Sequence, residues 1–408
     1  MTISVPGPTL GVVGGGQLGR MLAEAASPLG VDVVVLDPTP EPPAGRVADA
    51  VAGAFDDADA VRSLAERVDA LTFEIELADP DLLASVREEY DVPVHPSPEA
   101  LRTTGDKLLE KQTLDEAGVP VPRYRRVDDA DDLREALEAF APSGGVMLKA
   151  RTGGYDGRGN VPVEPGDDPE AALADIGNAP AVAEELIDFE REVSVVGVRG
   201  ENGTRQFPLG ENVHEAEILR ETVAPARTSD AVAERAHEVA EDVLAVLDGR
   251  GVFGIELFEC EPQRGSGTSS GRGPRDSDGE ILVNEIAPRP HNSGHWTIEG
   301  ARTSQFEQHV RAVLGWPLGS TALRAPTVSA NILGDVEEPT TAELRGVDAA
   351  LAAENVSLHW YGKREARPLR KMGHITATAD ADPEDESARD DLLARAREVR
   401  DRMTFRTD

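Results

Sequence analysis

A glycine-rich loop preceded by a lysine is the segment of this sequence best suited to hold a polyphosphate. Lys149 ends an apolar run, and four of the next ten residues, Ala150 to Gly159, are glycines. Amides of such a loop can approach phosphate oxygens, and a cation on the preceding strand can neutralise charge during phosphoryl transfer. The Walker pattern G-x-x-x-x-G-K-[ST] does not occur in the sequence. We therefore expect a glycine flap over a nucleoside triphosphate.

Two glutamates lie inside apolar segments that have the character of strands. Glu256 alternates with aliphatic and aromatic residues in 252–260, and Glu285 lies in the aliphatic segment 280–286. A carboxylate in such a strand is costly to desolvate unless it meets a cation. On neighbouring strands the two could hold Mg²⁺ against ATP phosphates. Salt bridges to arginine are the alternative interpretation.

A second glycine motif, G-x-G-x-x-G, runs from Gly14 to Gly19, and Asp37 follows 18 residues later. This pattern is typical of dinucleotide-binding turns, in which bare amides meet a phosphate at a helix N-terminus. An NAD-dependent oxidoreductase is therefore one hypothesis. The motif alone is weak, because any phosphate-binding turn between strand and helix needs the same geometry.

The segment Ala287 to Trp296 is expected to form a polar active-site loop. Arg289 has the planar fork that suits a small oxyanion. His291 and His295 are four residues apart, a zinc-binding spacing on a helix, but Pro290 and Gly294 argue against a helix there.

A basic cluster stands out in an otherwise acidic chain: Lys363, Arg364, Arg367, Arg370 and Lys371. One interpretation is a phosphate site for a second substrate. A salt-bridge network between domains is the alternative.

The elements that would position these residues alternate between strands and helices. A strand at 9–13, the glycine turn, a helix at 20–29 and a strand at 31–36 form a βαβ unit with a parallel sheet. Further strands are expected at 70–75, 146–149, 182–186, 193–198, 252–260, 280–286, 328–333 and 374–377, and helices at 104–117 and 231–247. Residues 262–279 contain no aliphatic or aromatic side chain and are expected to form a flexible insertion at a hairpin tip.

Composition excludes several classes. The 408 residues include 76 Asp+Glu and 41 Lys+Arg, a net charge of −35 that disfavours binding to nucleic acid. No apolar run of 18 residues and no secretory signal are found, and Cys260 is the single cysteine. We expect a cytoplasmic protein. The acidity and the scarcity of lysine suggest adaptation to a salty cytoplasm, since salt screens repulsion between carboxylates.

Taken together, the motifs resemble those of the ATP-grasp 5-(carboxyamino)imidazole ribonucleotide synthases of purine biosynthesis. The matching stretches are GGGQLGRM from Gly14, LKARTGGYDGRGN from Leu148, ENVHEAEILRETVAPA from Glu211, NEIAPRPHNSGHWT from Asn284 and HWYGKREARPLRKMGH from His359. They extend from about residue 10 to about 375. The departures are the 262–279 insertion and one apparent extra residue around Arg364.

The resemblance implies an α/β fold of ATP-grasp architecture. An N-terminal Rossmann-like (pre-ATP-grasp) domain would span 1–103. A two-part ATP-grasp module would span 104–320, with a lid subdomain at about 120–190. A small β-rich C-terminal domain would span 321–408. The resemblance also implies a homodimer and transfer of the product to a carboxyaminoimidazole ribonucleotide mutase.

The resemblance assigns roles to individual residues. The implied ATP contacts are Lys107, Lys149, Gly153, Gly154, Tyr155, Asp156, Gly157, Arg158, Gly159, Glu184, Glu185, Leu186, Ile187, Glu192, His214, Asn284 and Glu285. Glu256 and Glu285 would bind Mg²⁺. The implied catalytic residues are Arg289, Tyr155, Arg158 and Glu76. The aminoimidazole ribonucleotide would contact Gln17, Leu18, Glu76, Lys363, Arg370 and Lys371.

The implied reaction uses ATP to convert bicarbonate into carboxyphosphate, which carboxylates the exocyclic amine of 5-aminoimidazole ribonucleotide without biotin. Four alternatives remain open at this stage. Within the fold, these are a formate-dependent glycinamide ribonucleotide transformylase or a biotin carboxylase. Outside it, they are an NAD oxidoreductase and a nucleotide-binding regulator without turnover, although the retained Lys149, Glu256 and Glu285 argue against the regulator.

Overall fold

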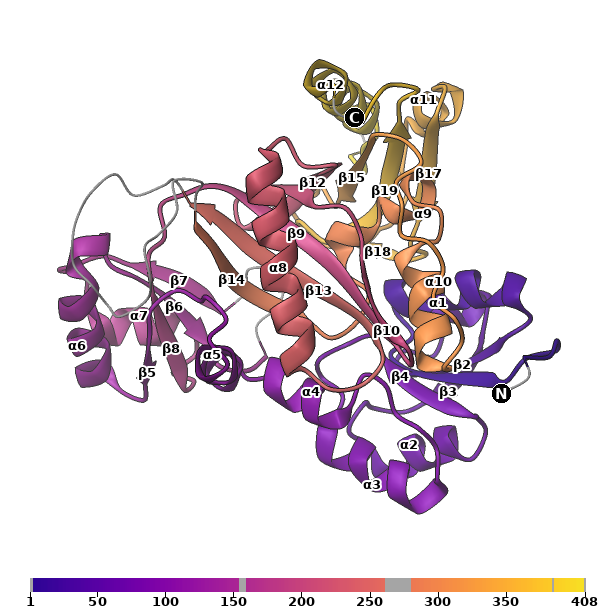
Figure 1. The fold of residues 1–408 in the computed structure, drawn as a ribbon, viewed down its shortest axis with the longest axis horizontal. Coiled ribbons are helices and arrows are strands. Elements are labelled where there is room, and N and C mark those ends of the chain that lie inside the picture. Colours follow the sequence, from indigo (N-terminus) through magenta and orange to yellow (C-terminus); the bar gives the residue numbers. More distant parts are fainter. Residues whose placement is uncertain (1–2, 154–158, 261–279, 384, 407–408) are drawn as a thin grey trace.

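The computed structural model describes residues 3–153, 159–260, 280–383 and 385–406, shown as coloured ribbon in Figure 1. Within these ranges the strands form two four-stranded sheets, one nine-stranded sheet and one two-stranded sheet. The expected insertion at 262–279 lies outside the described residues.

The N-terminal sheet is parallel and has the strand order β3-β2-β1-β4. Its strands are β1 (Thr9–Val13), β2 (Asp32–Asp37), β3 (Asp49–Ala52) and β4 (Ala70–Phe73), and the helices of this part are α1 (Gln17–Ala26), α2 (Ala58–Ala65), α3 (Pro80–Tyr90) and α4 (Pro98–Thr104). One apolar cluster joins the sheet to α1, and a second joins it to α2 and α3. The expected βαβ unit with a parallel sheet is confirmed, and because helices cover both faces the sheet is doubly wound.

The second four-stranded sheet is antiparallel, with the order β5-β8-β6-β7. It comprises β5 (Tyr124–Val127), β6 (Val146–Ala150), β7 (Asn160–Val163) and β8 (Ala181–Glu185), with α6 (Ala130–Phe140) and α7 (Pro169–Asp175). Leu133, Leu137 and Phe140 of α6 share its apolar core. This sheet lies at the left of Figure 1 and is joined to the rest through α5 (Lys107–Glu116).

The central sheet has the order β14-β13-β9-β11-β12-β15-β19-β17, and β10 pairs with β9. Its strands are β9 (Phe189–Gly200), β10 (Gly203–Gln206), β11 (Gly210–Glu215), β12 (Ile218–Ala224), β13 (Gly251–Cys260), β14 (Glu280–Ala287), β15 (Thr327–Leu333), β17 (Val356–Trp360) and β19 (Lys371–Thr378). The two-stranded sheet pairs β16 (Thr340–Thr341) with β18 (Glu365–Ala366). Helix α8 (Asp230–Val246) packs on the β9 and β13 face, and the remaining helices are α9 (Thr297–Gly300), α10 (Gln305–Val313), α11 (Val347–Ala352) and α12 (Glu386–Asp401).

The helix expected at 104–117 is wrong in extent, because α4 ends at Thr104 and a new helix begins after Asp106. The Asp106 carboxylate accepts hydrogen bonds from the amides of Leu108 and Leu109, at 3.0 and 3.3 Å. Such a side chain is a strong N-cap and starts a separate helix. The interruption places Lys107 in the first turn of α5.

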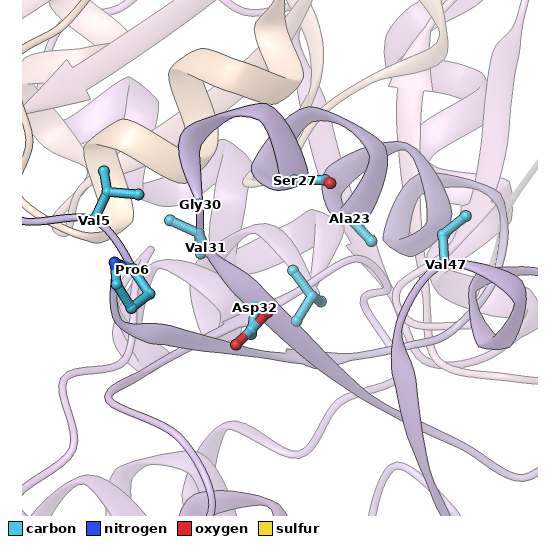
Figure 2. A pocket seen from close by; sticks show the side chains of 9 residues that line it. Val5, Pro6, Ala23, Ser27, Gly30, Val31, Asp32 and Val47 are labelled. Atoms are coloured by element: carbon cyan, nitrogen blue, oxygen red, sulfur yellow. The ribbon is translucent and has the colours of Figure 1, made fainter.

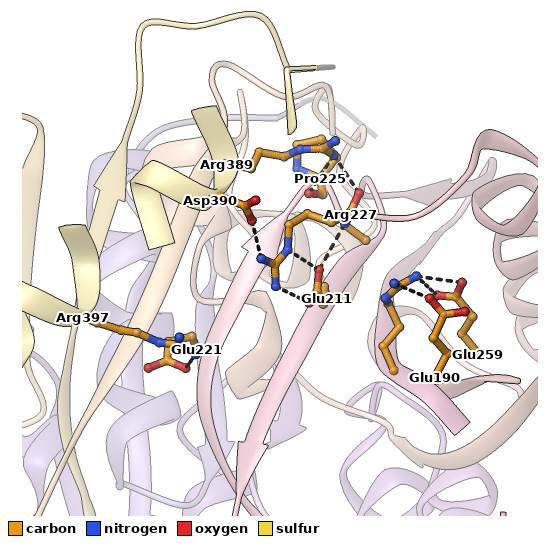
Figure 3. Close-up of polar contacts among 11 residues, drawn as sticks. Glu190, Glu211, Glu221, Pro225, Arg227, Glu259, Arg389, Asp390 and Arg397 are labelled. Atoms are coloured by element: carbon orange, nitrogen blue, oxygen red, sulfur yellow. Dashed lines mark hydrogen bonds and ion pairs between the residues drawn. The ribbon is translucent and has the colours of Figure 1, made fainter. Parts of the chain in front are cut away.

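Helix α12 was not predicted, because few of its residues are apolar. In the structure its residues Leu392, Leu393, Ala396 and Val399 pack into an apolar core with β15 and β19, and arginines add ionic contacts to the sheet (Figure 3). Arg397 lies 3.1 Å from Glu221 of β12, Arg400 also pairs with Glu221, and Arg389 donates to the carbonyl of Ala226 at 2.8 Å. Glu221 is 2% exposed. The arginines therefore compensate a carboxylate that would otherwise be buried without a partner.

Candidate active site

Glu256 and Glu285 lie directly opposite each other on the adjacent antiparallel strands β13 and β14. Directly opposed residues project from the same face of a sheet. The predicted juxtaposition of the two carboxylates is therefore confirmed. Burial, followed by the charge of Glu285, raises the pKa of Glu256 to about 7.

A β-bulge adjoins this pair. Glu256 is paired with Glu285 and Leu257 with Val283, so Asn284 is an extra residue on β14. The bulge changes the direction of the Asn284 side chain, whose Oδ1 accepts a hydrogen bond from Lys149 Nζ at 3.0 Å. Lys149, at the end of β6, is 6% exposed and also donates to Glu184 at 3.0 Å.

Lys107 joins the two parts of the site. Its Nζ donates to Glu285 Oε2 at 2.7 Å. The Lys107 ammonium is the main cause that holds the pKa of Glu285 well below its usual range. Burial acts to lower the pKa of Lys107, but the carboxylates of Glu285, Glu110 and Glu184 together outweigh burial and the pKa is raised. Two cations and two carboxylates thus meet beside the end of the glycine loop.

The loop itself is described only at its ends. Ala150 N donates to Gly159 O at 2.8 Å, which closes the base of the loop, and Gly153 and Gly159 have positive φ angles of 78° and 82°. Lys107 N donates to Arg151 O at 2.9 Å, so the base is also attached to α5. The predicted residues Gly154, Tyr155, Asp156, Gly157 and Arg158 lie outside the described residues.

The expected adenine hinge, Glu184 to Ile187, begins at the end of β8. The side chain of Glu184 is 2% exposed and faces Lys149 and Lys111, at 3.0 and 3.5 Å. Glu185 instead accepts a hydrogen bond from Arg123 Nε at 2.7 Å. Both carboxylates are engaged within the protein, so a base at Leu186 or Ile187 would be read mainly through main-chain groups.

His214 on β11 lies beside Glu192 on β9, with Nδ1 3.3 Å from a carboxylate oxygen. Burial acts to lower the pKa of His214, but Glu192 raises it above its ordinary value. His291 lies across from the same region, with Nε2 3.6 Å from Glu256. The central sheet thus presents a polar face around the carboxylate pair.

Arg289 follows β14 and forms an ion pair with Glu76, which follows β4, at 2.5 Å. These two predicted residues come from different sheets. Arg289 is at the same time close enough to Glu74 to act against the rise in its pKa. The ion pair connects the loop after β14 to the N-terminal part.

The first glycine loop is occupied by the chain's own carboxylates. Glu74 accepts hydrogen bonds from the amides of Gly16 and, at 2.8 Å, Gly19, while Asp37 accepts one from Gly15 at 3.0 Å. In a dinucleotide-binding turn these amides face the pyrophosphate. The glycine pattern here therefore serves an internal anion, which removes the main support for an NAD site.

Gln17 is where three parts of the chain meet. Lys363 Nζ donates to Gln17 Oε1 at 3.3 Å, and Gln17 Nε2 lies 3.0 Å from His295 Nε2. The His295 ring in turn packs on that of His374, with centroids 4.8 Å apart. The structure thus brings the predicted residues Gln17 and Lys363 together. Leu18 is buried in the N-terminal core, so its side chain is not directed to a ligand site.

The basic cluster divides into two groups. Arg364 pairs with Glu41 and Arg367 with Glu365 at the surface, as the salt-bridge interpretation expects. Arg370 donates to the carbonyl of Glu365 at 3.0 Å. Lys371 is close enough to Glu256 and His214 to act against the rise in the pKa of each. The phosphate-binding role expected for Lys363, Arg370 and Lys371 stays a prediction.

Sequence reasoning missed three buried charged residues near the site: Glu74, Glu110 and Lys111. All three are less than 10% exposed. For Lys111 a signal was available, since it is one of only five lysines and lies four residues after Lys107 on one helix face. For Glu74 the sequence offered none, because its partners lie more than fifty residues away.

A hollow of about 350 Å³ lies elsewhere, at the outer end of β2 (Figure 2). It is bounded by Val5, Pro6, Ala23, Ser27, Gly30, Val31, Asp32, Val33 and Val47. None of the predicted site residues lines it. The candidate site is therefore defined by the convergence of charged groups and not by this hollow.

Three family models match successive parts of the chain. They are the ribonucleotide synthetase preATP-grasp domain at residues 8–104, the ATP-grasp domain at 112–306 and the phosphoribosylaminoimidazole carboxylase C-terminal domain at 327–388. Among curated proteins, the N5-carboxyaminoimidazole ribonucleotide synthase of Brucella melitensis is 42% identical over 91% of this chain and 96% of the relative. The chain belongs to the N5-carboxyaminoimidazole ribonucleotide synthase family.

Other members of this synthase family support the same assignment. The Bacillus subtilis synthase is 37% identical over 94% of each chain. The crystal structure of the Aspergillus clavatus synthase complexed with ATP has a TM-score of 0.83 and 37% identity, and covers 97% of this chain and 99% of that chain. The same synthase in complex with ADP and 5-aminoimidazole ribonucleotide gives a TM-score of 0.84, 36% identity and the same coverage. The chain is therefore an ATP-dependent ligase with the ATP-grasp fold.

The residues present fit the magnesium ion that ATP-grasp chemistry implies. Mg²⁺ is usually held by one or two carboxylates together with phosphate oxygens. Glu256 and Glu285 supply two carboxylates on one face. Among the residues that the structure describes, no group of three or more His, Cys, Asp or Glu is placed to hold a metal by itself. Phosphate oxygens would therefore have to complete the coordination.

In the described part of the chain, no helix combines the length and the apolar character needed to cross a bilayer.

Proposed function

We propose that this protein carboxylates 5-aminoimidazole ribonucleotide with bicarbonate and ATP, giving N5-carboxyaminoimidazole ribonucleotide, ADP and phosphate. The observation that carries the proposal is the convergence of Lys107, Lys149, Glu256 and Glu285 on one face of β13 and β14, beside the bulge at Asn284. Family membership supplies the substrates, and the neighbouring Arg289–Glu76 pair supplies groups suited to a small oxyanion and an amine.

For the nucleotide, we propose that Lys107 and Lys149 bind the phosphates beneath the glycine loop. Magnesium bound by Glu256 and Glu285 would neutralise phosphate charge and orient the terminal phosphoryl group. The ribose would lie near Glu192 and His214, and the base near Leu186 and Ile187. Entry of nucleotide requires Lys107 to exchange Glu285 for a phosphate oxygen, which ionic complementarity makes feasible.

For the one-carbon substrate, we propose that Arg289 holds bicarbonate through its planar guanidinium. A bicarbonate oxygen attacks the γ-phosphorus of ATP, the bond to the β-phosphate oxygen breaks, and ADP leaves. The carboxyphosphate formed then releases phosphate as the exocyclic amine of the ribonucleotide takes the carboxyl group and loses a proton. Most of the catalytic contribution comes from positioning and charge stabilisation.

For the ribonucleotide, we propose that Gln17, Lys363, Arg370 and Lys371 bind its phosphate, while Glu76 lies near the reacting amine. The support is the bond between Lys363 and Gln17, which places a cation and an amide from opposite ends of the chain side by side. Glu76 would also keep Arg289 oriented before bicarbonate binds. Tyr155 and Arg158 would complete the site from the glycine loop.

The decisive experiment measures ADP release and incorporation of labelled bicarbonate, with and without 5-aminoimidazole ribonucleotide. Both signals should depend on the ribonucleotide and neither on formate, glycinamide ribonucleotide or NAD. Glu285→Ala should lower turnover by at least ~100-fold, because a carboxylate that orients developing charge is lost. Glu234→Ala, on the exposed face of α8, is the matched control. Normal turnover in Glu285→Ala would remove this residue from the site.

We further propose that the protein is a homodimer that passes its labile product to a mutase. We also propose that it functions in a cytoplasm of high salt concentration. Domain bounds of 1–103, 104–320 and 321–408 are proposed with it. They are supported by the ranges of the matching family models, 8–104, 112–306 and 327–388. Sedimentation of the full chain at several salt concentrations tests the dimer.

A further inference from the structure

The outer edge of β14 is the starting point. β14 is the last strand in the order of the central sheet, so among the residues that the structure describes one side of it has no strand partner. An edge strand presents free N–H and C=O groups, which must be satisfied when the edge is buried. The bulge at Asn284 adds one more unpaired peptide at the position where the side chains of Asn284 and Glu285 enter the candidate site.

The carbonyl of Pro120 accepts the amide of Val283 at 2.8 Å, and two adjacent residues of α5 satisfy further groups of this edge. Lys111 Nζ donates to the carbonyls of Val283 and Asn284, at 3.0 and 2.6 Å. Glu110 Oε2 accepts the amide of Ile286 at 3.1 Å. These bonds grip β14 on both sides of Glu285.

Both α5 side chains are almost completely buried, at 1% and 2% exposure. A buried ammonium is stable only when its donors are satisfied, and Lys111 has a third acceptor in Glu184 at 3.5 Å. A helix that merely covered a sheet edge could do so with apolar side chains. The two polar side chains are explained by their specific main-chain partners, which are the carbonyls of Val283 and Asn284 for Lys111 and the amide of Ile286 for Glu110.

The same helix face carries Lys107, at the spacing i, i+3, i+4 from Glu110 and Lys111. Lys107 bonds to the Glu285 side chain, while Glu110 and Lys111 bond to the main chain around it. A shift of α5 or loss of either main-chain contact would therefore move Asn284 and Glu285 relative to Lys149 and Lys107.

We propose that Glu110 and Lys111 are positioning residues of the nucleotide site, which hold the bulged edge of β14 so that Asn284 and Glu285 face the phosphates and metal of ATP. The inference rests on the proposed nucleotide site. It adds two residues that touch neither nucleotide nor metal.

The test measures binding of Mg·ADP to the full chain by calorimetry, in parallel with the thermal midpoint of each variant. Lys111→Met keeps the side-chain length but removes the donors, and it should weaken Mg·ADP binding by about 10- to 100-fold, the usual effect of losing an outer partner of a metal ligand. Gln112→Met, on the exposed face of the same helix, is the matched control and should bind as the wild type does.

The Glu110 pair guards against a folding defect. Glu110→Gln retains an oxygen for the Ile286 amide and should stay within about 3-fold of wild type, whereas Glu110→Ala should lose at least ~10-fold. If Lys111→Met does not fold, this pair decides the question. Wild-type affinity for Mg·ADP in both Lys111→Met and Glu110→Ala would overturn the proposal.

A second ligand separates positioning from general damage. Affinity for 5-aminoimidazole ribonucleotide should stay within about 3-fold in the variants, and parallel loss of both ligands with a lower midpoint would overturn the proposal. If the wild type binds Mg·ADP but does not carboxylate the ribonucleotide, the proposed reaction fails, while weaker Mg·ADP binding by Lys111→Met still supports the positioning role.

Discussion

Glu74 links the glycine loop of the N-terminal part to the loop that carries Arg289. Its carboxylate accepts the amides of Gly16 and Gly19, yet burial raises its pKa to about 7. Gln17 lies between these two glycines, so the orientation of a predicted substrate residue depends on a buried carboxyl group whose charge changes near neutral pH.

A stability prediction follows from the sign of this shift. The folded pKa of Glu74, about 7, is above the unfolded value of 4.5. Its contribution to stability is therefore complete below about pH 4.5 and lost as pH rises through 7, by on the order of 3 kcal/mol at most. The urea midpoint of wild type should fall from pH 5 to pH 8 more steeply than that of Glu74→Gln. Parallel curves would contradict the assigned pKa.

At this scale, sequence alone located the residues whose type is unusual for their surroundings. Lys149, Glu256 and Glu285 could be predicted because a charge in an apolar strand needs a partner, and their convergence is observed. Glu74 and Lys111 could not be placed, because their roles depend on main-chain groups of Gly16 and Asn284 that only the folded chain brings near.

Among the elements, the turn between β1 and α1 depends on a glycine for two separate reasons. Gly14 has φ = 114°, and a Cβ there would lie 2.3 Å from Cγ of Glu74. Gly166 has a similar φ of 107° but no atom within 4 Å of the added Cβ. A substitution at Gly166 would therefore report backbone strain alone, whereas one at Gly14 would report backbone strain and a steric clash with Glu74.

We expect Gly14→Ala to lower the thermal midpoint several degrees more than Gly166→Ala. Both variants carry a left-handed backbone penalty of roughly 1–2 kcal/mol, but only the first displaces Glu74. Turnover should fall in Gly14→Ala alone, because Gln17 moves with the loop. Equal thermal midpoints in the two variants would show that the Glu74 side chain can move away from the added Cβ without loss of stability, and would contradict this prediction.

The predictability of elements followed their apolar patterns. The βαβ unit and helix α8 were expected, since their buried residues recur at regular spacing. Helix α12 was missed although Leu392, Leu393, Ala396 and Val399 recur at helical spacing and pack on the central sheet, because charged residues dominate the rest of that segment.

Across the whole molecule, charge is the dominant feature. A net charge of −35 opposes compaction at low salt, and the Debye length falls from ~10 Å at 0.1 M to ~3 Å at 1 M. We expect the thermal midpoint to rise by ~10 °C or more between 0.1 and 1 M KCl and to level off above that. Scanning calorimetry of the full chain measures it, and a midpoint independent of KCl would refute adaptation to salt.

The fold of the whole chain was accessible from family resemblance, but the continuity of the central sheet was not. The sequence suggested a separate β-rich C-terminal unit. In the structure β15, β19 and β17 extend the sheet that contains β13 and β14. Strand pairing between distant segments, such as β12 with β15, has no local signature in the sequence.

That continuity has a mechanical consequence. Five strand spacings, about 24 Å in a flat sheet, separate β13, which carries Glu256, from β19, which begins at Lys371, and paired strands connect the two without a break. The strands that carry the proposed magnesium ligands and the strand that begins at Lys371 therefore belong to one continuous sheet. A hinge motion that changed the distance between these strands would have to deform the hydrogen-bonded strand pairs between them.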